Sequence, residues 1–275
     1  VYFSRDTLWN IKKAIIGNKS IHKGKAVVCY LDLLGFSNTI RREWNNKDKN
    51  PLDLLLSLKE QITSLENQKR LILKEHGSGE EKRVYYCNTK FISDSIIITL
   101  PIGDDMTIGD VWFAIQGMFN SIANCWGMCL EVGYTIRGGI DYGDVYWNEK
   151  DIIGPAYMDA YVLESDVAKV SRVVCGDKFI ELVNDINMKM GSQNTAILRN
   201  LVYDVDGLLC VNPNIMYDDK EIEVFLTNQV LELMKGKSAY IKHKYLSLHK
   251  MLVNKDELHV PTIEEAKNYS IKIKE

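Results

Sequence analysis

The alternation of β-rich runs with helical segments constrains the fold of this chain most. Ala26–Leu33 is an apolar run with β-branched residues and one embedded acidic residue, which predicts a buried strand. Gly35 ends that run, and Phe36–Trp44 opens a helix. Pro51–Glu75 carries leucines at helical spacing and predicts a long amphipathic helix. The chain is therefore expected to begin its core with one strand followed by two helices.

The segments that follow complete a recognisable order. In chain order they are two β-rich runs that meet at a tight hairpin (Val84–Ile92 and Asp94–Leu100), a helix (Met106–Leu130), a strand pair around Gly143 (Val132–Ile140 and Asp144–Trp147), a helix (Pro155–Val167), a short strand (Val173–Cys175) and a helix that ends near Met190. Strand–helix–strand–strand–helix–strand is the split βαβ order of ferredoxin-like folds. We therefore predict an α+β protein with a ferredoxin-like βαββαβ core.

Three parts are expected along the chain. Residues 1–25 are predicted to form an amphipathic lead-in helix that ends in a Lys/Gly turn at Lys23–Lys25, and residues 26–190 to form the core domain. Residues 191–275 differ in character, with a polar loop and an acidic patch followed by helical segments rich in lysine. We predict that they form a C-terminal helical extension.

Composition limits the kinds of partner. The chain has 34 Lys and Arg against 37 Asp and Glu, a formal net charge of −3, so no nucleic-acid partner is expected. No apolar run reaches the roughly 18 residues that cross a bilayer, and the first residues lack a signal-peptide layout. Six cysteines without a Cys-x-x-Cys pair indicate buried thiols in a reducing compartment. We expect a cytoplasmic protein without a membrane partner.

Two acidic residues point to chemistry. Asp32 is embedded near the end of the apolar run, where a carboxylate is costly unless it is paired, capped or bound to a metal. Asp94 lies in the predicted hairpin turn, where an Asp often serves the turn itself. In a split βαβ sheet the first strand lies beside this hairpin, so both carboxylates can meet at one end of the sheet. Their repulsion is relieved by a hard divalent cation, Mg²⁺ or Mn²⁺.

Short blocks of residues follow one another in a distinctive order: Asp32–Ser37 (DLLGFS), Ser93-Asp94, Arg137–Gly143 (RGGIDYG) and Asp151–Ala156 (DIIGPA). This ordered set resembles the class III nucleotidyl cyclase catalytic domain. A later run, Ala160–Val174, looks specifically like the bacterial pyrimidine cyclases of Pycsar anti-phage defence. The resemblance covers residues 25–180, approximately, and leaves the C-terminal part unmatched.

The resemblance implies a two-metal site. Asp32 and Asp94 would hold two ions, Mg²⁺ or Mn²⁺, with the backbone carbonyl of Leu33 as a further ligand. One ion would help to deprotonate the ribose 3′-OH, and the other would neutralise the triphosphate and the leaving pyrophosphate.

The resemblance also implies nucleotide contacts. The backbone of Gly35, Phe36 and Ser37 opens a helix, and free N–H groups at a helix start suit phosphate oxygens. Ser37 is equally open to an interpretation as the helix N-cap. Lys90 and Asp151 stand at the two positions that recognise adenine in adenylate-type members. A donor and an acceptor can also recognise a uracil or cytosine edge, so they leave the base open.

Family sites form between two head-to-tail subunits, which implies a homodimer with shared active sites. Purine cyclases place an Asn and an Arg at the positions of Met158 and Val162, and both polar groups are missing here. Another cation would have to stabilise the transferring phosphoryl group. Arg137 is the first candidate. The others are Arg41, Arg42 and Arg172.

The expected function is that of a uridylate cyclase, which converts the nucleoside triphosphate UTP into cyclic UMP and pyrophosphate. By resemblance, the product would be a second messenger that activates a separate effector during phage infection. UTP is preferred over CTP on family frequency alone, and ATP stays open. A catalytically silent cyclase-like module that binds nucleotide is the alternative from another class. A palm-type polymerase is disfavoured by the acidic charge.

Overall fold

A computed structural model describes residues 22–46, 48, 50–75, 87–191, 196–215 and 220–271, with only the backbone of 66–75. Eight strands form one sheet in the order β2-β3-β1-β4-β6-β8-β7, and β5 pairs with β4 off this path. The strands are β1 (His22–Leu33), β2 (Asn88–Ile92), β3 (Ser95–Pro101), β4 (Ile136–Trp147), β5 (Ile152–Ile153), β6 (Val173–Cys175), β7 (Leu201–Tyr203) and β8 (Leu209–Val211). The order β2-β3-β1-β4 is that of a split βαβ unit, so the predicted α+β class is confirmed.

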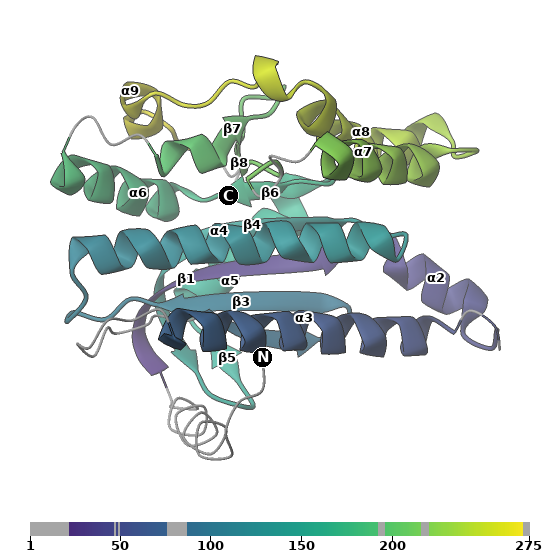
Figure 1. The fold of residues 1–275 in the computed structure, drawn as a ribbon, viewed down its shortest axis with the longest axis horizontal. Coiled ribbons are helices and arrows are strands. Elements are labelled where there is room, and N and C mark those ends of the chain that lie inside the picture. The colour runs from purple at the N-terminus through teal and green to yellow at the C-terminus, as the bar shows by residue number, and fades with distance from the viewer. Residues whose placement is uncertain are drawn as a thin grey trace.

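Helices cover both faces of the sheet. Figure 1 shows α3 and α4 in front of the strands and α5 behind them. The α-helices are α2 (Phe36–Glu43), α3 (Pro51–Glu75), α4 (Ile108–Glu131), α5 (Pro155–Val162), α6 (Asp177–Met190), α7 (Lys220–Met234), α8 (Ala239–Val253) and α9 (Ile263–Lys267). Shorter turns are the π-helical η1 (Leu163–Ala168) and the 3₁₀ turns η2 (Leu198–Asn200) and η3 (Lys255–Glu257). Among the helices described, none is long and apolar enough to cross a membrane.

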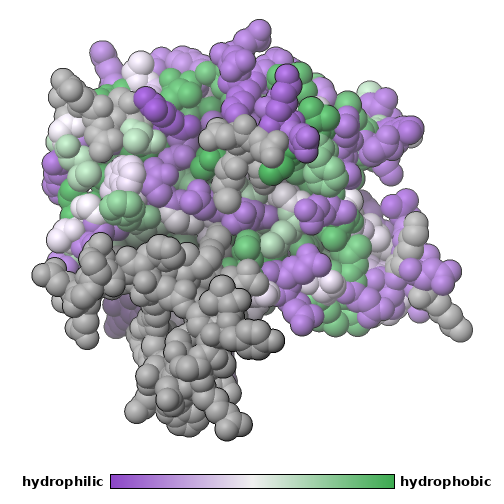
Figure 2. Space-filling view, in the orientation of Figure 1, coloured by the Kyte–Doolittle hydropathy of each residue, from purple (hydrophilic) through white to green (hydrophobic). Residues whose placement is uncertain are grey.

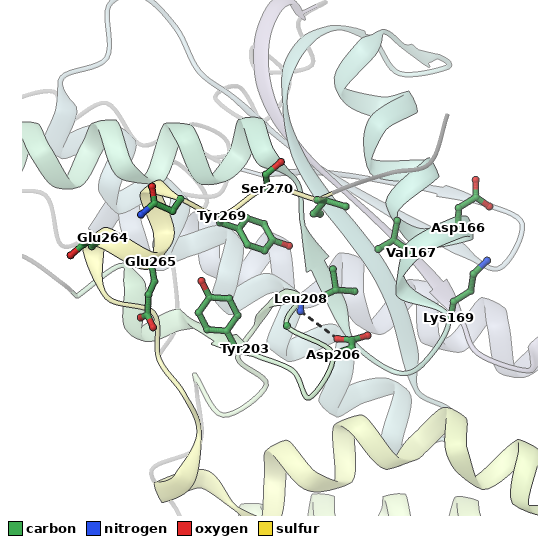
Figure 3. A pocket seen from close by; sticks show the side chains of 13 residues that line it. Asp166, Val167, Lys169, Tyr203, Asp206, Leu208, Glu264, Glu265, Tyr269 and Ser270 are labelled. Carbon is green, nitrogen blue, oxygen red and sulfur yellow. Dashed lines mark hydrogen bonds between the residues drawn. The ribbon is translucent and has the colours of Figure 1, made fainter.

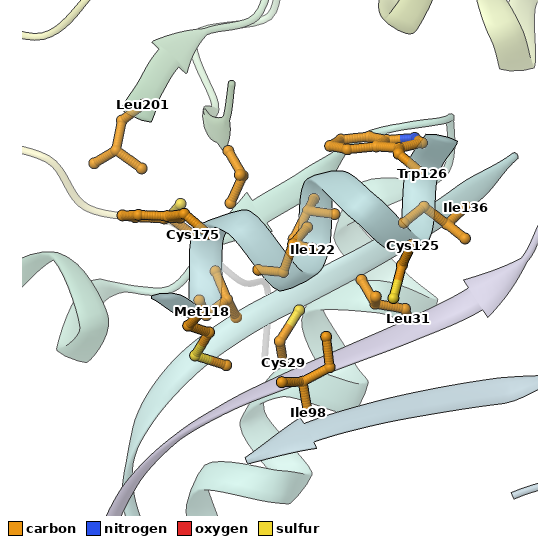
Figure 4. Close-up of a cluster of buried hydrophobic side chains, with 14 of the residues drawn as sticks. Cys29, Leu31, Ile98, Met118, Ile122, Cys125, Trp126, Ile136, Cys175 and Leu201 are labelled. Atoms are coloured by element: carbon orange, nitrogen blue, oxygen red, sulfur yellow. The ribbon is translucent and has the colours of Figure 1, made fainter. Parts of the chain in front are cut away.

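The central strand β1 divides its side chains between two apolar clusters. Cys29 and Leu31 belong to the large cluster beneath α3 and α4, which Figure 4 shows around Ile122 and Trp126 of α4. Tyr30 belongs to a smaller cluster under α5. Because side chains alternate along a strand, Asp32 is directed to the same face as Tyr30. The sequence thus places its embedded carboxylate on the thinly covered α5 side rather than in the main core.

The surface over α3 and α4 is mixed in character. Figure 2 shows hydrophilic and hydrophobic residues interspersed on this face. The α3 bounds agree with the segment predicted from its leucines, yet Leu52 and Leu56 are exposed. The leucine-rich helix is therefore only partly buried by the sheet and α4.

The prediction of a strand pair around Gly143 is wrong. β4 runs without interruption through Gly143, which pairs with Ala26 of β1. A Cβ placed on Gly143 would lie 3.6 Å from the Cβ of Ala156, at the start of α5. That separation is an ordinary van der Waals contact, so Gly143 lies against the start of α5 within a continuous strand and does not make a turn.

Two further expectations differ from the structure at the ends of the core. Lys23–Lys25, predicted to end the lead-in in a turn, belong to β1, which begins at His22, and the residues before His22 lie outside the described ones. The C-terminal extension, predicted to be helical, also supplies β7 and β8 to the sheet. These three-residue strands are too short to show a periodic pattern, so the sequence gives no signal for them. The division at 26 and 191 stays a prediction.

A buried charge network joins the C-terminal extension to the core. Arg172 Nη1 donates to Asp204 at 2.7 Å and to Asp206 at 2.8 Å, and Ser247 of α8 donates to Asp204 at 2.6 Å. The Nε of Arg172 also donates to the carbonyl of Ala168, at the end of η1. The side chains of Arg172 and Asp204 are 6% and 4% exposed, so the network is largely shielded from water.

We predict that Arg172→Ala lowers the free energy of unfolding by about 3 kcal/mol or more, because it leaves the Asp204 carboxylate buried without its cation. The matched control is Lys178→Ala, which breaks an exposed ion pair with Asp159 and should cost less than about 1 kcal/mol. Urea unfolding followed by circular dichroism measures both. Equal losses in the two variants would contradict the structural role of the network.

Candidate functional site

Asp32 occupies the end of the central strand, between two neighbouring strands. It pairs in register with Ser95 of β3 on one side and with Arg137 of β4 on the other. Its side chain is 23% exposed, so the carboxylate is half-buried but reachable. Beside it, Tyr30 donates a hydrogen bond to Ser95 at 2.8 Å. The strand thus presents one accessible carboxylate in a polar patch on the α5 face.

Asp94 is brought to Asp32 by the β2–β3 hairpin. The turn consists of Ser93 and Asp94, and Ser93 has a positive φ of 53° that the tight turn requires. Asp32 pairs with Ser95, and Asp94 immediately precedes Ser95 in the chain. Burial and, second, the charge of Asp94 raise the pKa of Asp32 to about 6, although Arg137 opposes the shift. The two predicted carboxylates therefore converge.

Arg137 stands between two acidic groups. Its Nη2 lies 3.5 Å from Oδ2 of Asp32, and its Nε lies 2.6 Å from Oε1 of Glu164. Burial raises the pKa of Glu164 to about 7, and Arg137 acts in the opposite direction. Two carboxylates thus contact one guanidinium, and Asp94 adds a further negative charge beside Asp32.

Gly35, Phe36 and Ser37 start α2 immediately after the Asp32 strand. Gly35 is the N-cap residue, with a φ of 89° that favours glycine, and it makes no side-chain cap. The interpretation of Ser37 as the N-cap is therefore wrong, since Ser37 lies in the first turn and is exposed. Phe36 is buried and anchors the helix against Tyr134. The first-turn amides stay free of a side-chain cap.

Lys90 and Asp151 are joined through Asn148, although Lys90 belongs to β2 and Asp151 precedes β5. Lys90 donates to the carbonyl of Asn148 at 2.8 Å, and the Oδ1 of Asn148 accepts from the amide of Asp151. Asn148 follows Trp147, which pairs with His22 at the opposite end of β1 from Asp32. The structure therefore joins the two base-recognition candidates to each other within one chain.

The other predicted cations are differently placed. Arg172 is committed to the buried Asp204 network, which excludes it as a ligand for phosphate. Arg41 and Arg42 lie in the last turn of α2, where Arg42 donates from Nε to the carbonyl of Asn38. Arg137 is the candidate that contacts Asp32 itself.

Two charged residues of the site escaped the sequence analysis. Lys59 of α3 lies over the ring of Phe91 at 5.6 Å, and burial lowers its pKa while the charge of Asp94 opposes the shift. Lys59 lies within the leucine-rich segment, whose pattern predicts a helix but indicates nothing about a charged site. Glu164 lies in the run that resembles the pyrimidine cyclases, but nothing in that run indicates that its carboxylate is buried.

The donor set fits a hard divalent cation. Asp32 and Asp94 offer carboxylate oxygens, and the backbone carbonyl of Leu33 adds an oxygen at the same strand end. In the part of the chain that the structure describes, no three His, Cys, Asp or Glu side chains are gathered as a ready-made metal site. Any ion held here would therefore rely on water or on substrate phosphates for its remaining ligands, as Mg²⁺ often does.

Two cavities among the described residues lie away from the Asp32 cluster. A cavity of about 1110 Å³ lies beside η1, the β7–β8 turn and the segment after α9, where Tyr203 and Tyr269 lie near Asp206 and Leu208 (Figure 3). A second, of about 770 Å³, lies between α2, α3 and α8 and reaches Gly35. None of the predicted metal ligands lines either of these two spaces.

Comparisons with known proteins give distant likenesses among solved structures alone. No protein-family model matches the chain, and no curated protein matches it. Among solved structures it is similar to one described as a bacterial light-regulated adenylyl cyclase, with 13% identity and a TM-score of 0.39. That alignment covers 82% of this chain and 69% of the other. The likeness carries no argument about activity, which rests on the residues themselves.

The raised pKa values predict a loss of stability with rising pH in metal-free protein. Asp32 titrates near 6 when folded, above its ordinary value of 3.8, so the native state holds a proton that the unfolded chain has released. Stability therefore falls as the pH rises between these values. From pH 5 to pH 8 the contribution of Asp32 is about 1 kcal/mol, because the folded pKa lies about one unit above pH 5.

Asp32→Asn should remove this contribution, so its free energy of unfolding in EDTA should fall less between pH 5 and pH 8. Asp144→Asn is the matched control, since that carboxylate is exposed beside Lys25. Urea titrations at the two pH values measure the difference. An Asp32→Asn variant with the full wild-type slope would contradict the assigned environment.

Proposed function

We propose that this protein is a nucleotidyl cyclase that converts a nucleoside triphosphate into its 3′,5′-cyclic monophosphate and pyrophosphate, with UTP as the preferred substrate. The observation that carries the proposal is the convergence of Asp32 and Asp94 at the end of β1 and the β2–β3 hairpin. A binding module gains little from two carboxylates that repel each other. In a pair that binds divalent ions, the charge of the ions offsets this repulsion.

The residues take distinct roles in the proposed reaction. Bound Mg²⁺ or Mn²⁺ would supply the charge that activates the 3′-OH and neutralises the triphosphate, held by Asp32, Asp94 and the Leu33 carbonyl. The uncapped first turn of α2, at Gly35, orients N–H groups that suit phosphate oxygens. Arg137 is the cation that stabilises the phosphoryl oxygens. It takes over the role of the Arg that purine cyclases carry at the position of Val162.

We also propose a homodimer with shared sites, from the resemblance of the sequence blocks. Lys90 is linked to Asp151 through Asn148 in one chain. Lys90 lies on the strand whose hairpin carries Asp94, and its register partner Ile97 pairs with Tyr30, so position along β1 does not separate this pair from the metal ligands. A second copy, placed head to tail, would bring the Lys90 pair of one subunit to the Asp32 cluster of the other.

The base and the biological role are the least constrained parts of the proposal. Lys90 offers a donor and Asp151 an acceptor, a combination that suits uracil, cytosine or adenine. The run Ala160–Val174 favours a pyrimidine and a messenger role in anti-phage defence, in which cyclic UMP activates a separate effector. A silent nucleotide-binding module is the second candidate, favoured by Met158 and Val162 at positions where purine cyclases carry polar groups.

We predict that purified protein with Mn²⁺ cyclises UTP faster than CTP, ATP or GTP, as measured by chromatographic resolution of the products. Asp32→Asn and Asp94→Asn should each reduce turnover by at least about 100-fold while the fold is kept, a loss typical of removing one stabilising group from a transition state. Asp144→Asn, on the exposed surface, should retain wild-type turnover.

The outcomes separate the candidates. Cyclic AMP or cyclic CMP as the main product would keep the cyclase and replace the base. Nucleotide binding without any cyclic product would favour the silent module. Full activity of the Asp32→Asn variant would refute the two-carboxylate mechanism.

A further inference from the structure

Glu164 is a buried carboxylate to which the proposed reaction gives no role. Its side chain is 4% exposed, and its Oε1 lies 2.6 Å from the Nε of Arg137. The contact is an ion pair without hydrogen-bond geometry, and neither atom has another hydrogen-bond partner. Burying a charge in this way is costly unless it is paired, so Arg137 and Glu164 stabilise one another.

The backbone is built to bring Glu164 onto β4. A Cβ on Gly139 would overlap the Cβ of Leu163 and the carbonyl of Ala160, and would lie 3.0 Å from the amide of Glu164. Gly139 follows Arg137 by two residues and therefore faces the same side of the strand. The helix also widens into the π-helical turn η1 at Leu163, a feature that often accompanies functional sites.

The guanidinium of Arg137 is held unequally at its two ends. The Nε contact to Glu164 is short, whereas the Nη2 contact to Asp32, at 3.5 Å, is at the outer limit of a hydrogen bond. A divalent cation on Asp32 would displace the weaker contact and leave the stronger one in place. Arg137 would then keep its position with its Nη donors free.

We propose that Glu164 is a positioning residue for Arg137. It fixes the Nε end of the guanidinium, so that the Nη groups, released from Asp32 when a divalent cation binds, are directed to the triphosphate. The inference rests on the proposed function, because it explains how the guanidinium of Arg137 is oriented toward the triphosphate in the same site. A merely structural Glu164 would neutralise Arg137 without affecting how the site binds phosphate.

The test is a double-mutant cycle of wild type, Arg137→Gln, Glu164→Gln and the double variant. The probe is 3′-deoxy-UTP with Mn²⁺, which lacks the attacking hydroxyl, so affinity is measured apart from turnover by isothermal titration calorimetry. Glu164→Gln should weaken binding of the probe about 10- to 100-fold, the usual effect of losing an orienting partner. In the Arg137→Gln background the same change should cause no further loss.

Controls separate positioning from folding. Asp159→Asn, on the exposed face of α5 beside Lys178, should bind the probe as wild type does. Glu164→Asp keeps the charge and should recover part of the lost affinity. Urea unfolding checks that each variant is folded. Equal losses from Glu164→Gln with and without Arg137, or wild-type affinity in Glu164→Gln, would overturn the inference.

The readouts also keep the two proposals apart. A wild type that binds the probe with coupled Arg137 and Glu164, yet makes no cyclic product from any nucleoside triphosphate, would remove the cyclase and leave the positioning role. If the wild type cyclises UTP and the Glu164→Gln variant binds the probe and turns over UTP normally, the cyclase is kept and the positioning role is refuted. A wild type that neither binds nor cyclises would refute both.

Discussion

The pairing of β1 on both of its edges is the constraint on which the rest of the structure depends. β4 pairs with it along its full length, and β3 pairs with its second half. Asp32 near its end is therefore held between Ser95 and Arg137 by backbone hydrogen bonds that leave the side chain little choice of surroundings. The hairpin that supplies β3 delivers Asp94 to the same place. A carboxylate pair is thus a consequence of the strand order.

The charges of the Asp32 cluster are less evenly matched than those of the Arg172 network. Asp32 and Glu164 contact Arg137, Asp94 lies beside Asp32, and burial raises the pKa of Asp32 to about 6 and that of Glu164 to about 7. By contrast, the buried charge of Arg172 is matched by two aspartates, one of which also accepts from Ser247. A cation from outside would relieve the repulsion between Asp32 and Asp94, which Arg137 offsets only in part.

The sequence predicts the parts that depend on periodicity and strand order. The buried strand of Asp32, the hairpin of Asp94 and the long leucine helix all follow from apolar patterns that local backbone geometry must obey. The pairing of Glu164 with Arg137 cannot be predicted in this way, because the residues around a buried glutamate need not differ from those around an exposed one. Gly143 is misleading for a related reason: a glycine within a continuous strand and a glycine that turns the chain look alike in sequence.

β8 covers the edge that β6 would otherwise present, and β7 then closes the sheet with three residues. On the other side, within the described residues, the sheet ends at the five-residue β2, which carries the charged Lys90. Long, flat, unpaired edges invite strands from other molecules, whereas short and charged ones discourage them. The C-terminal residues therefore widen the sheet by two strands and still leave, at that border, a strand too short to be a good template for another chain.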